Sequence, residues 1–206
     1  MKKYEFNLDP KAARRVGSAP RITKTGAYKG ILKDVFVYET KRGAAMLRIE
    51  FLDDEDRRAS LDLCIKKADG TDAFGMGIFH ALMTVCKMRY AITQICPNVP
   101  VFGDNHKQEV GRFMEMLNKR VGLFIRAVHD ENQARYPDSI ELMTPFDYTT
   151  GQTAAEILDK TEAKRLDLLI AGTTDRIIRK RAEDSFESPA PASEPDQSDF
   201  PDDVPF

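Results

Sequence analysis

The sequence contains no tryptophan, three cysteines, three histidines and no long apolar segment. Cys64, Cys86 and Cys96 are an odd number and lack the Cys-x-x-Cys spacing of zinc ribbons, so we expect reduced thiols, mostly buried. The histidines are scattered among different predicted elements, whereas ligand spacing is the signal for a metal site. The sequence therefore predicts neither a metal site nor a cofactor.

Membrane spans and common catalytic motifs are also missing. No segment approaches the roughly 20 apolar residues of a membrane span, and residues 1–10 lack the apolar core of a signal peptide, so we expect a cytoplasmic protein. Residues 74–77 contain a lone Gly-x-Gly, and no Walker A sequence is present. The acidic cluster Asp53–Asp56 sits where a hairpin turn is expected rather than a Mg²⁺ site. We therefore expect no enzymatic activity.

Acidic and basic residues are divided unevenly along the chain. The formal net charge of the 206 residues is -2, with 31 Lys and Arg against 33 Asp and Glu. Residues 183–206 contain eight of the acidic residues and no Lys or Arg, so this segment carries -8 and residues 1–182 carry +6. Such a division predicts a basic binding body and an acidic interaction tail.

The first half of the chain has the pattern of three consecutive strands. Residues 26–38 are rich in β-branched and aromatic residues, and apolar and polar side chains alternate in residues 46–52 and again in residues 61–66. The basic turn Lys41–Gly43 and the acidic cluster Asp53–Asp56 separate these segments. Two hairpins are therefore expected.

A helical period replaces the strand pattern between residues 73 and 90, where apolar residues recur at three- and four-residue steps. A loop at residues 97–105 and a short helix at residues 106–118 are expected next. Alternation in residues 121–128 and the pattern of residues 139–146 predict two further strands. The predicted order is three strands, a helix and two strands.

A helical extension and a polar tail follow the predicted strands. Thr153 and Glu156 match the capping-box pattern and predict a helix that packs on the body. The apolar residues of this helix are Leu158, Leu166, Leu169 and Ile170. Residues 184–198 consist mainly of Ser, Pro, Glu, Asp and Ala and predict a disordered linker. We therefore expect a body at 1–150, a helical extension at 151–183 and an acidic tail at 184–206.

The last eight residues are Asp199, Phe200, Pro201, Asp202, Asp203, Val204, Pro205 and Phe206. They resemble the tip of bacterial single-stranded DNA-binding proteins, Asp-Phe-Asp-Asp-Asp-Ile-Pro-Phe, with Pro201 in place of Asp and Val204 in place of Ile. The body looks more like the divergent phage versions than the short bacterial proteins. The resemblance implies an OB-fold barrel that coats single-stranded DNA in replication, recombination or repair. A five-stranded OB barrel with a helix between strands three and four agrees with the predicted order.

The chemistry of the tip predicts how a partner binds it. Phe206 would supply both an aromatic ring and a terminal carboxylate, which require an apolar pocket rimmed by Arg or Lys. Pro205 restricts the backbone, and the carboxylates steer the tip toward basic surfaces. An alternative is a tail that only aids solubility, but such a tail needs no terminal aromatic. The predicted interaction residues are Asp199, Phe200, Asp202, Asp203, Val204, Pro205 and Phe206, and the resemblance implies partners such as exonuclease I or a polymerase accessory subunit.

Single-strand binding without sequence preference needs cations for phosphates and aromatic faces for bases, and without tryptophan the stacking falls to Phe and Tyr. Phe124 and Arg126 alternate with Val121, Leu123 and Ile125, so we expect them to point outward. Which face of the first strand contacts DNA stays open. The predicted DNA-binding residues are Tyr28, Lys33, Phe36, Tyr38, Lys41, Arg42, Arg48, Phe124, Arg126, Arg135 and Tyr136.

Two alternatives stay open at the level of sequence. A single-strand annealing or recombination protein would have the same basic body, and RNA would satisfy the same stacking and phosphate contacts. A homo-oligomer is compatible with the sequence, which does not fix the oligomeric state, the site size or the cooperativity of binding.

Overall fold

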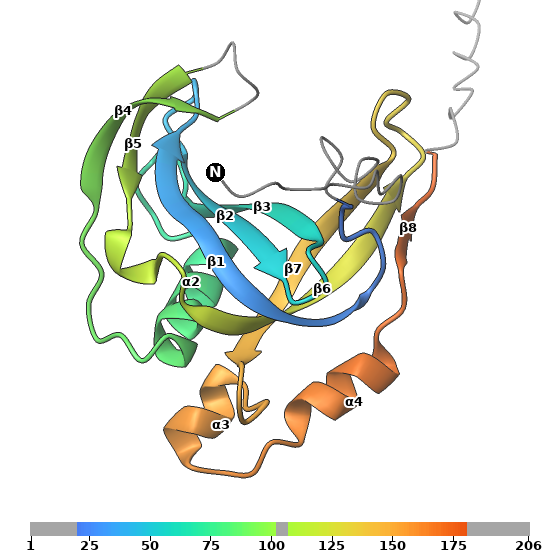
Figure 1. Cartoon of the computed structure of the whole chain (residues 1–206). Coiled ribbons are helices and arrows are strands. Elements are labelled where there is room, and N and C mark those ends of the chain that lie inside the picture. Colours follow the sequence, from blue (N-terminus) through green and yellow to red (C-terminus); the bar gives the residue numbers. More distant parts are fainter. Residues whose placement is uncertain (1–19, 102–106, 181–206) are drawn as a thin grey trace, which may run out of the picture.

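The computed structural model describes residues 20–101 and 107–180, which form a mainly β structure (Figure 1). Within these residues, one open and predominantly antiparallel sheet of eight strands is accompanied by three α-helices. The elements are β1 (Gly26–Glu39), β2 (Ala45–Asp53), β3 (Arg58–Lys66), α2 (Phe74–Val85), β4 (Gln94–Pro100), β5 (Lys107–Arg112), the short 3₁₀ helix η1 (Met114–Met116), β6 (Arg120–Asp130), β7 (Asp138–Asp147), α3 (Ala154–Asp159), α4 (Arg165–Gly172) and β8 (Arg176–Ile178).

Strand β1 connects the two parts of the sheet, because it pairs with β2, β5 and β6. One edge of β1 pairs with β2 along most of its length, and β2 pairs in turn with β3. On the other edge, residues 26–31 pair with β6, whereas Phe36 and Val37 pair with β5. The register between β1 and β2 shifts between Leu32 and Asp34, which is the kind of irregularity that bends a strand. The sheet therefore has two parts that meet at β1. We call β1, β2, β3, β6 and β7 the body, and β4 and β5 the arm.

The body does not close into a complete barrel. In the described part of the chain, no hydrogen-bonded ladder joins β3 to β7, and α2 packs against both of these strands instead. Gly75 in the first turn of α2 allows this packing, because a Cβ atom there would lie 2.4 Å from the carbonyl oxygen of Cys64. The prediction of a mainly β body with a helix after the third strand is confirmed, but a closed five-stranded barrel is not.

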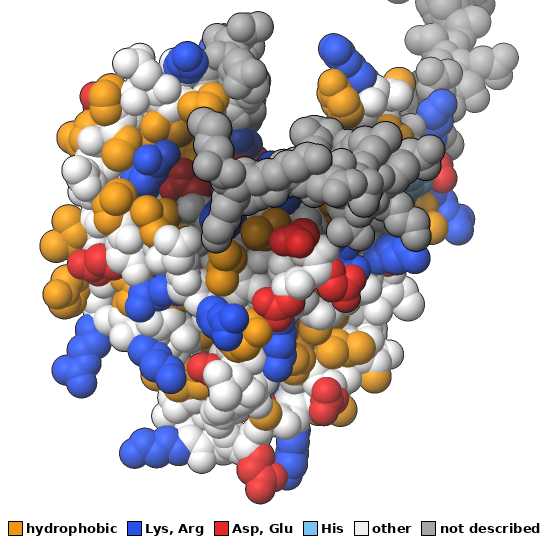
Figure 2. Space-filling model, viewed as in Figure 1, with side chains coloured by type: hydrophobic (Ala, Val, Ile, Leu, Met, Phe, Trp, Pro, Cys, Tyr) orange, Lys and Arg blue, Asp and Glu red, His pale blue; other side chains and the backbone are white. Residues whose placement is uncertain are grey.

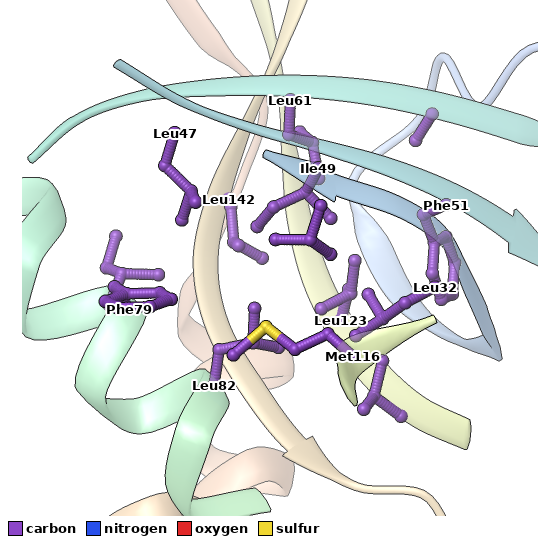
Figure 3. Close-up of a cluster of buried hydrophobic side chains, with 14 of the residues drawn as sticks. Leu32, Leu47, Ile49, Phe51, Leu61, Phe79, Leu82, Met116, Leu123 and Leu142 are labelled. Atoms are coloured by element: carbon purple, nitrogen blue, oxygen red, sulfur yellow. The ribbon is translucent and has the colours of Figure 1, made fainter. Parts of the chain in front are cut away.

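The main core lies inside the body, between the sheet and α2. Leu47, Ile49 and Phe51 of β2 are fully buried, as the alternation of residues 46–52 predicted. Figure 3 shows them facing Phe79 and Leu82 of α2 together with apolar side chains from β1, β6 and β7. Burial of each such side chain contributes about 1.5–3 kcal/mol, so this face of the sheet is fixed by packing.

Two predictions about the residues of the arm are wrong. Residues 97–105 were expected to form a loop and residues 106–118 a helix, but residues 94–100 and 107–112 form the paired strands β4 and β5. Val110 is buried between the exposed Glu109 and the half-buried Gly111, which is a strand pattern too short to recognise in the sequence. The arm buries its own small cluster, which consists of Phe36, Tyr38, Val99, Val101 and Val110.

The C-terminal extension is two short helices rather than one long one. The capping box of Thr153 and Glu156 is confirmed at the start of α3, which ends at Lys160 in a left-handed conformation with φ of 55°. Helix α4 buries none of its residues, and Leu158 and Leu168 are 70% and 72% exposed. The expectation that the helix packs on the body holds for α3, which packs against α2 and β7, but not for α4. The short strand β8 was not predicted.

Glu156 joins the two helices by accepting several hydrogen bonds. One carboxylate oxygen accepts from the backbone N–H groups of Lys164 and Arg165, each at 2.7 Å. The other accepts from the backbone N–H and the hydroxyl of Thr153, each at 2.8 Å. Burial alone would raise the pKa of Glu156, but these hydrogen bonds lower it from 4.5 to about 2.

Replacing Glu156 with glutamine should therefore destabilise the protein in a pH-dependent way. At about pH 7 we expect a loss of about 1–3 kcal/mol, because a neutral amide cannot accept all four hydrogen bonds. Since the pKa is lower in the folded state, the wild-type advantage is complete above pH 4.5 and shrinks as the pH falls toward about 2. Thermal melting of both proteins at several pH values would measure this difference in stability.

The matched control is Glu162→Gln, because this carboxylate is exposed. Among the hydrogen bonds and ion pairs of the described residues, its one partner is the Lys164 ammonium, at 2.8 Å. It should melt like the wild type. A difference between wild type and Glu156→Gln that stays constant with pH would contradict the proposed role of the carboxylate.

Across residues 20–101 and 107–180, no helix is long and apolar enough to span a lipid bilayer.

Candidate nucleic-acid interface

Two exposed loops carry predicted DNA-binding residues at the same end of the sheet (Figure 1). The β1–β2 loop presents Lys41 and Arg42, both exposed, in a tight turn that Gly43 completes with φ of 81°. The backbone N–H of Ala44 donates to the hydroxyl of Thr40 at 3.1 Å, which fixes this turn. In Figure 2, atoms of residues that the structure does not describe cover the space between this end of the arm and the β6–β7 hairpin. The predicted basic turn is confirmed.

The β6–β7 loop presents Arg135 and Tyr136. The ring of Tyr136 is 68% exposed, and the Arg135 guanidinium carbon lies 5.4 Å from its centroid. His129 and Asp138 face each other at the base of the loop, with Nδ1 and Oδ1 2.6 Å apart. This contact raises the pKa of His129. The loop thus exposes an aromatic ring and a cation, and the contact between His129 and Asp138 holds the base of its hairpin.

Strand β8 adds basic residues beside this loop. It runs parallel to the end of β6, where the backbone N–H of Glu131 donates to the carbonyl of Ile178 at 2.9 Å. Arg179 and Lys180 follow, and both are exposed. Three residues are too few for a recognisable strand pattern, which is why the sequence did not predict β8.

Arg48 lies on the outward face of β2, but its charge is paired. Its Nε and Nη2 atoms donate to the two carboxylate oxygens of Asp62, at 2.9 and 2.5 Å, and Nη1 donates to the carbonyl of Val101. The Tyr38 hydroxyl donates to the same carboxylate at 3.2 Å. Burial, reinforced by Asp62, raises the pKa of Tyr38 to about 12. Arg48 therefore joins the body to the arm, and its predicted phosphate contact would have to compete with Asp62.

Three predicted stacking residues are buried. Phe124 is 0% exposed, so the expectation of an outward, accessible ring is wrong. Alternation separates the two faces of a strand but does not show whether both are covered, and in β6 every residue from Val121 to Ile125 is buried, so both faces are covered there. Phe36 and Tyr38 are also buried, because β4 and β5 pack against them.

The remaining predicted residues are also distributed rather than gathered. Arg126 forms an ion pair with Glu141, which lies opposite it on β7. Tyr28 is half-buried, with the Arg57 guanidinium 5.0 Å from its ring centroid. Lys33 is exposed on β1. The structure therefore brings Lys41 with Arg42, and Arg135 with Tyr136, into two exposed loops, and leaves the other candidates outside them.

A hollow of about 430 Å³ lies on the arm but is unsuited to phosphates. Its lining combines Thr93, Ile95 and Val37 with two exposed carboxylates, Glu39 and Glu109. These acidic residues would repel the backbone of a nucleic acid.

Metal-binding side chains do not converge in residues 20–101 and 107–180, where no group of three or more His, Cys, Asp or Glu is placed to hold an ion. Cys86 is buried, whereas Cys64 and Cys96 are half-buried. The acidic cluster is a turn, as predicted, because the Asp53 carboxylate accepts from the backbone N–H of Arg57 at 2.7 Å and from its Nε at 2.6 Å.

No protein-family model and no curated protein matches this chain. The linker at residues 184–198 and the tip at residues 199–206 lie outside the described residues.

Proposed function

We propose that this protein binds single-stranded DNA without sequence preference and coats it during replication, recombination or repair. The path of the chain supports an OB-type body. Strands β1, β2 and β3 form a meander, α2 follows, and β6 then pairs with both β1 and β7. OB folds are partly open barrels of five strands in this order, so β4 and β5 count as an insertion between the helix and the fourth strand.

The observation that carries the proposal is the position of the two basic loops. OB folds bind oligonucleotides with the loops that join strands one to two and strands four to five. The corresponding β1–β2 and β6–β7 loops hold Lys41, Arg42, Arg135 and Tyr136, all exposed. None of the three cations has a carboxylate partner among the ion pairs of the described chain. These exposed cations suit the neutralisation of phosphates, while Tyr136 offers a face for a base.

The tail belongs to the proposal through its resemblance to the tip of single-stranded DNA-binding proteins. Residues 199–206 would recruit replication or repair proteins to the coated strand. The division of charge supports this role, because a segment with a net charge of -8 is unsuited to binding phosphates itself.

A competition experiment tests DNA binding. A labelled homopolymer single strand should be displaced by unlabelled single strands far better than by duplex of the same length, because bases in a duplex are not available for stacking. Affinity should fall as salt rises, with a slope of about -0.7 per phosphate contacted. Equal competition by duplex would refute the proposal. Single-stranded RNA as a third competitor would show whether the 2′-hydroxyl affects binding.

A further inference from the structure

A second basic surface lies at the other end of β1, away from the two loops. We call it the basal patch, and its residues are Lys29, Lys33, Lys119, Arg120 and Tyr148. Strand pairing brings them together: in the register of β1 and β6, Lys29 lies opposite Gly122 and Ile31 lies opposite Arg120. The backbone N–H of Leu32 donates to the carbonyl of Lys119 at 3.0 Å, which places Lys119 beside Lys33.

An aromatic ring holds two of these cations in place. The ammonium of Lys29 and the guanidinium carbon of Arg120 lie 5.6 and 4.9 Å from the centroid of the Tyr148 ring. The Tyr148 hydroxyl donates to the carboxylate of Asp54 at 2.9 Å, which fixes the ring. Cation–π contacts of this kind orient a cation without neutralising its charge.

The Asp54 carboxylate borders the basal patch, but no carboxylate in residues 20–101 and 107–180 forms an ion pair with its cations. Asp54 accepts from Tyr148, and the carboxylate of Asp147 accepts from the backbone N–H groups of Thr149 and Thr150 at 2.9 and 2.8 Å. Lys29 and Arg120 form no ion pair with any residue in 20–101 or 107–180. The same is true of Lys33 and Lys119.

The basal patch and the loops are separate surfaces of one sheet. Arg120 and Arg126 lie on the same face of β6, but the fully buried Phe124 lies between them. Along β1, the strand contour to Lys41 in the β1–β2 loop is about 26 Å from Lys33 and about 40 Å from Lys29, at about 3.3 Å per residue. Only a strand of sufficient length could contact both surfaces.

We propose that the basal patch is a second contact site for the phosphates of a long single strand. This inference rests on the proposed function. Unpaired Lys and Arg side chains held on a rigid sheet suit a polyanion, and the distance between the basal patch and the loops makes the contact dependent on strand length. Short strands would occupy the loops alone.

The test compares the wild type with Lys29→Ala/Arg120→Ala on oligonucleotides of two lengths, about 8 and about 40 nucleotides, chosen around the 4–16 nucleotides that one OB fold covers. Affinity for the long strand should fall about tenfold at low salt, and its salt slope should become smaller by about 1.4, because two phosphate contacts are lost. Affinity for the short strand should not change. Circular dichroism would verify that the variant is folded.

Lys160→Ala/Arg165→Ala is the matched control, because both cations are exposed on the helical extension, away from β1. It should bind both lengths like the wild type. Unchanged long-strand affinity in the basal variant, or an equal loss on both lengths, would overturn the inference. The inference would also be overturned if deleting residues 183–206 removed the difference in long-strand affinity between the basal variant and the wild type. The basal patch would then be a binding site for the acidic tail. If the wild type binds neither length, the proposed function fails together with the inference.

Discussion

Reversing the charges of the two loops, with Lys41→Glu, Arg42→Glu and Arg135→Glu combined, should lower affinity for single-stranded DNA by about 100-fold or more at low salt. Each lost phosphate contact weakens binding several-fold under these conditions, and each new carboxylate adds repulsion. The loss should shrink as salt rises, because screening weakens attraction and repulsion alike. Fluorescence anisotropy of a labelled oligonucleotide over a range of salt concentrations would measure it.

A control variant separates contact from overall charge. Lys67→Glu, Lys160→Glu and Arg165→Glu combined change the net charge of the chain from -2 to -8, as the loop variant does, at exposed positions outside the loops. If this control loses as much affinity as the loop variant, the loops have no special role. If only the loop variant loses affinity, the two loops are part of the interface.

The sequence was sufficient for the parts of the fold that depend on regular alternation. Strands β1, β2, β3, β6 and β7 and helix α2 are all found where the pattern of side chains predicted them, within a few residues. The start of α3 was predicted because the capping box has a specific spacing, and both of its hydrogen bonds are formed. These features are local, so a single sequence contains the information that specifies them.

The sequence did not predict the arm, and the errors in the candidate site follow from that. Alternation shows which residues share a face of a strand, but it does not show what packs on that face. Phe36 and Tyr38 were candidates for stacking because β4 and β5, which bury them, were taken for a loop and a helix. Phe124 was placed on the correct face of its strand, but its burial depends on packing that no local pattern shows.

The ion pairs of two arginines, in contrast, could have been predicted from strand register. Arg48 lies opposite Asp62 in the β2–β3 hairpin, and Arg126 lies opposite Glu141 in the β6–β7 hairpin. The β2–β3 hairpin was predicted, and β6 and β7 were predicted as consecutive strands, so aligning these strands as antiparallel pairs would have paired these residues. The exposed loops needed no such information, because turns that carry polar residues are exposed in most folds.

Deleting residues 199–206 should abolish binding to a partner such as exonuclease I, while affinity for single-stranded DNA stays the same or rises. The deletion removes three side-chain carboxylates, which supply the charge of the tip, and the apolar residues Phe200, Pro201, Val204, Pro205 and Phe206, among which are its anchors. Affinity for DNA should rise if the acidic tail competes with phosphates for Lys41, Arg42 and Arg135, since these cations have no carboxylate partner in the ion pairs of the described chain. Titration of full-length and shortened proteins with a labelled oligonucleotide, and separately with the partner, would measure both effects.

Deleting residues 188–195 provides a control of equal length, because it removes eight residues but only one carboxylate and leaves the tip intact. This shorter tail should still bind the partner, since recognition by the tip requires its own side chains rather than a particular linker length. The 199–206 deletion contradicts the role of the tip if partner affinity survives, and it contradicts the competition if affinity for DNA falls. Because charge attracts the tail to the loops while apolar contacts anchor the tip to a partner, raising the salt should remove the difference in DNA affinity and leave the difference in partner binding largely in place.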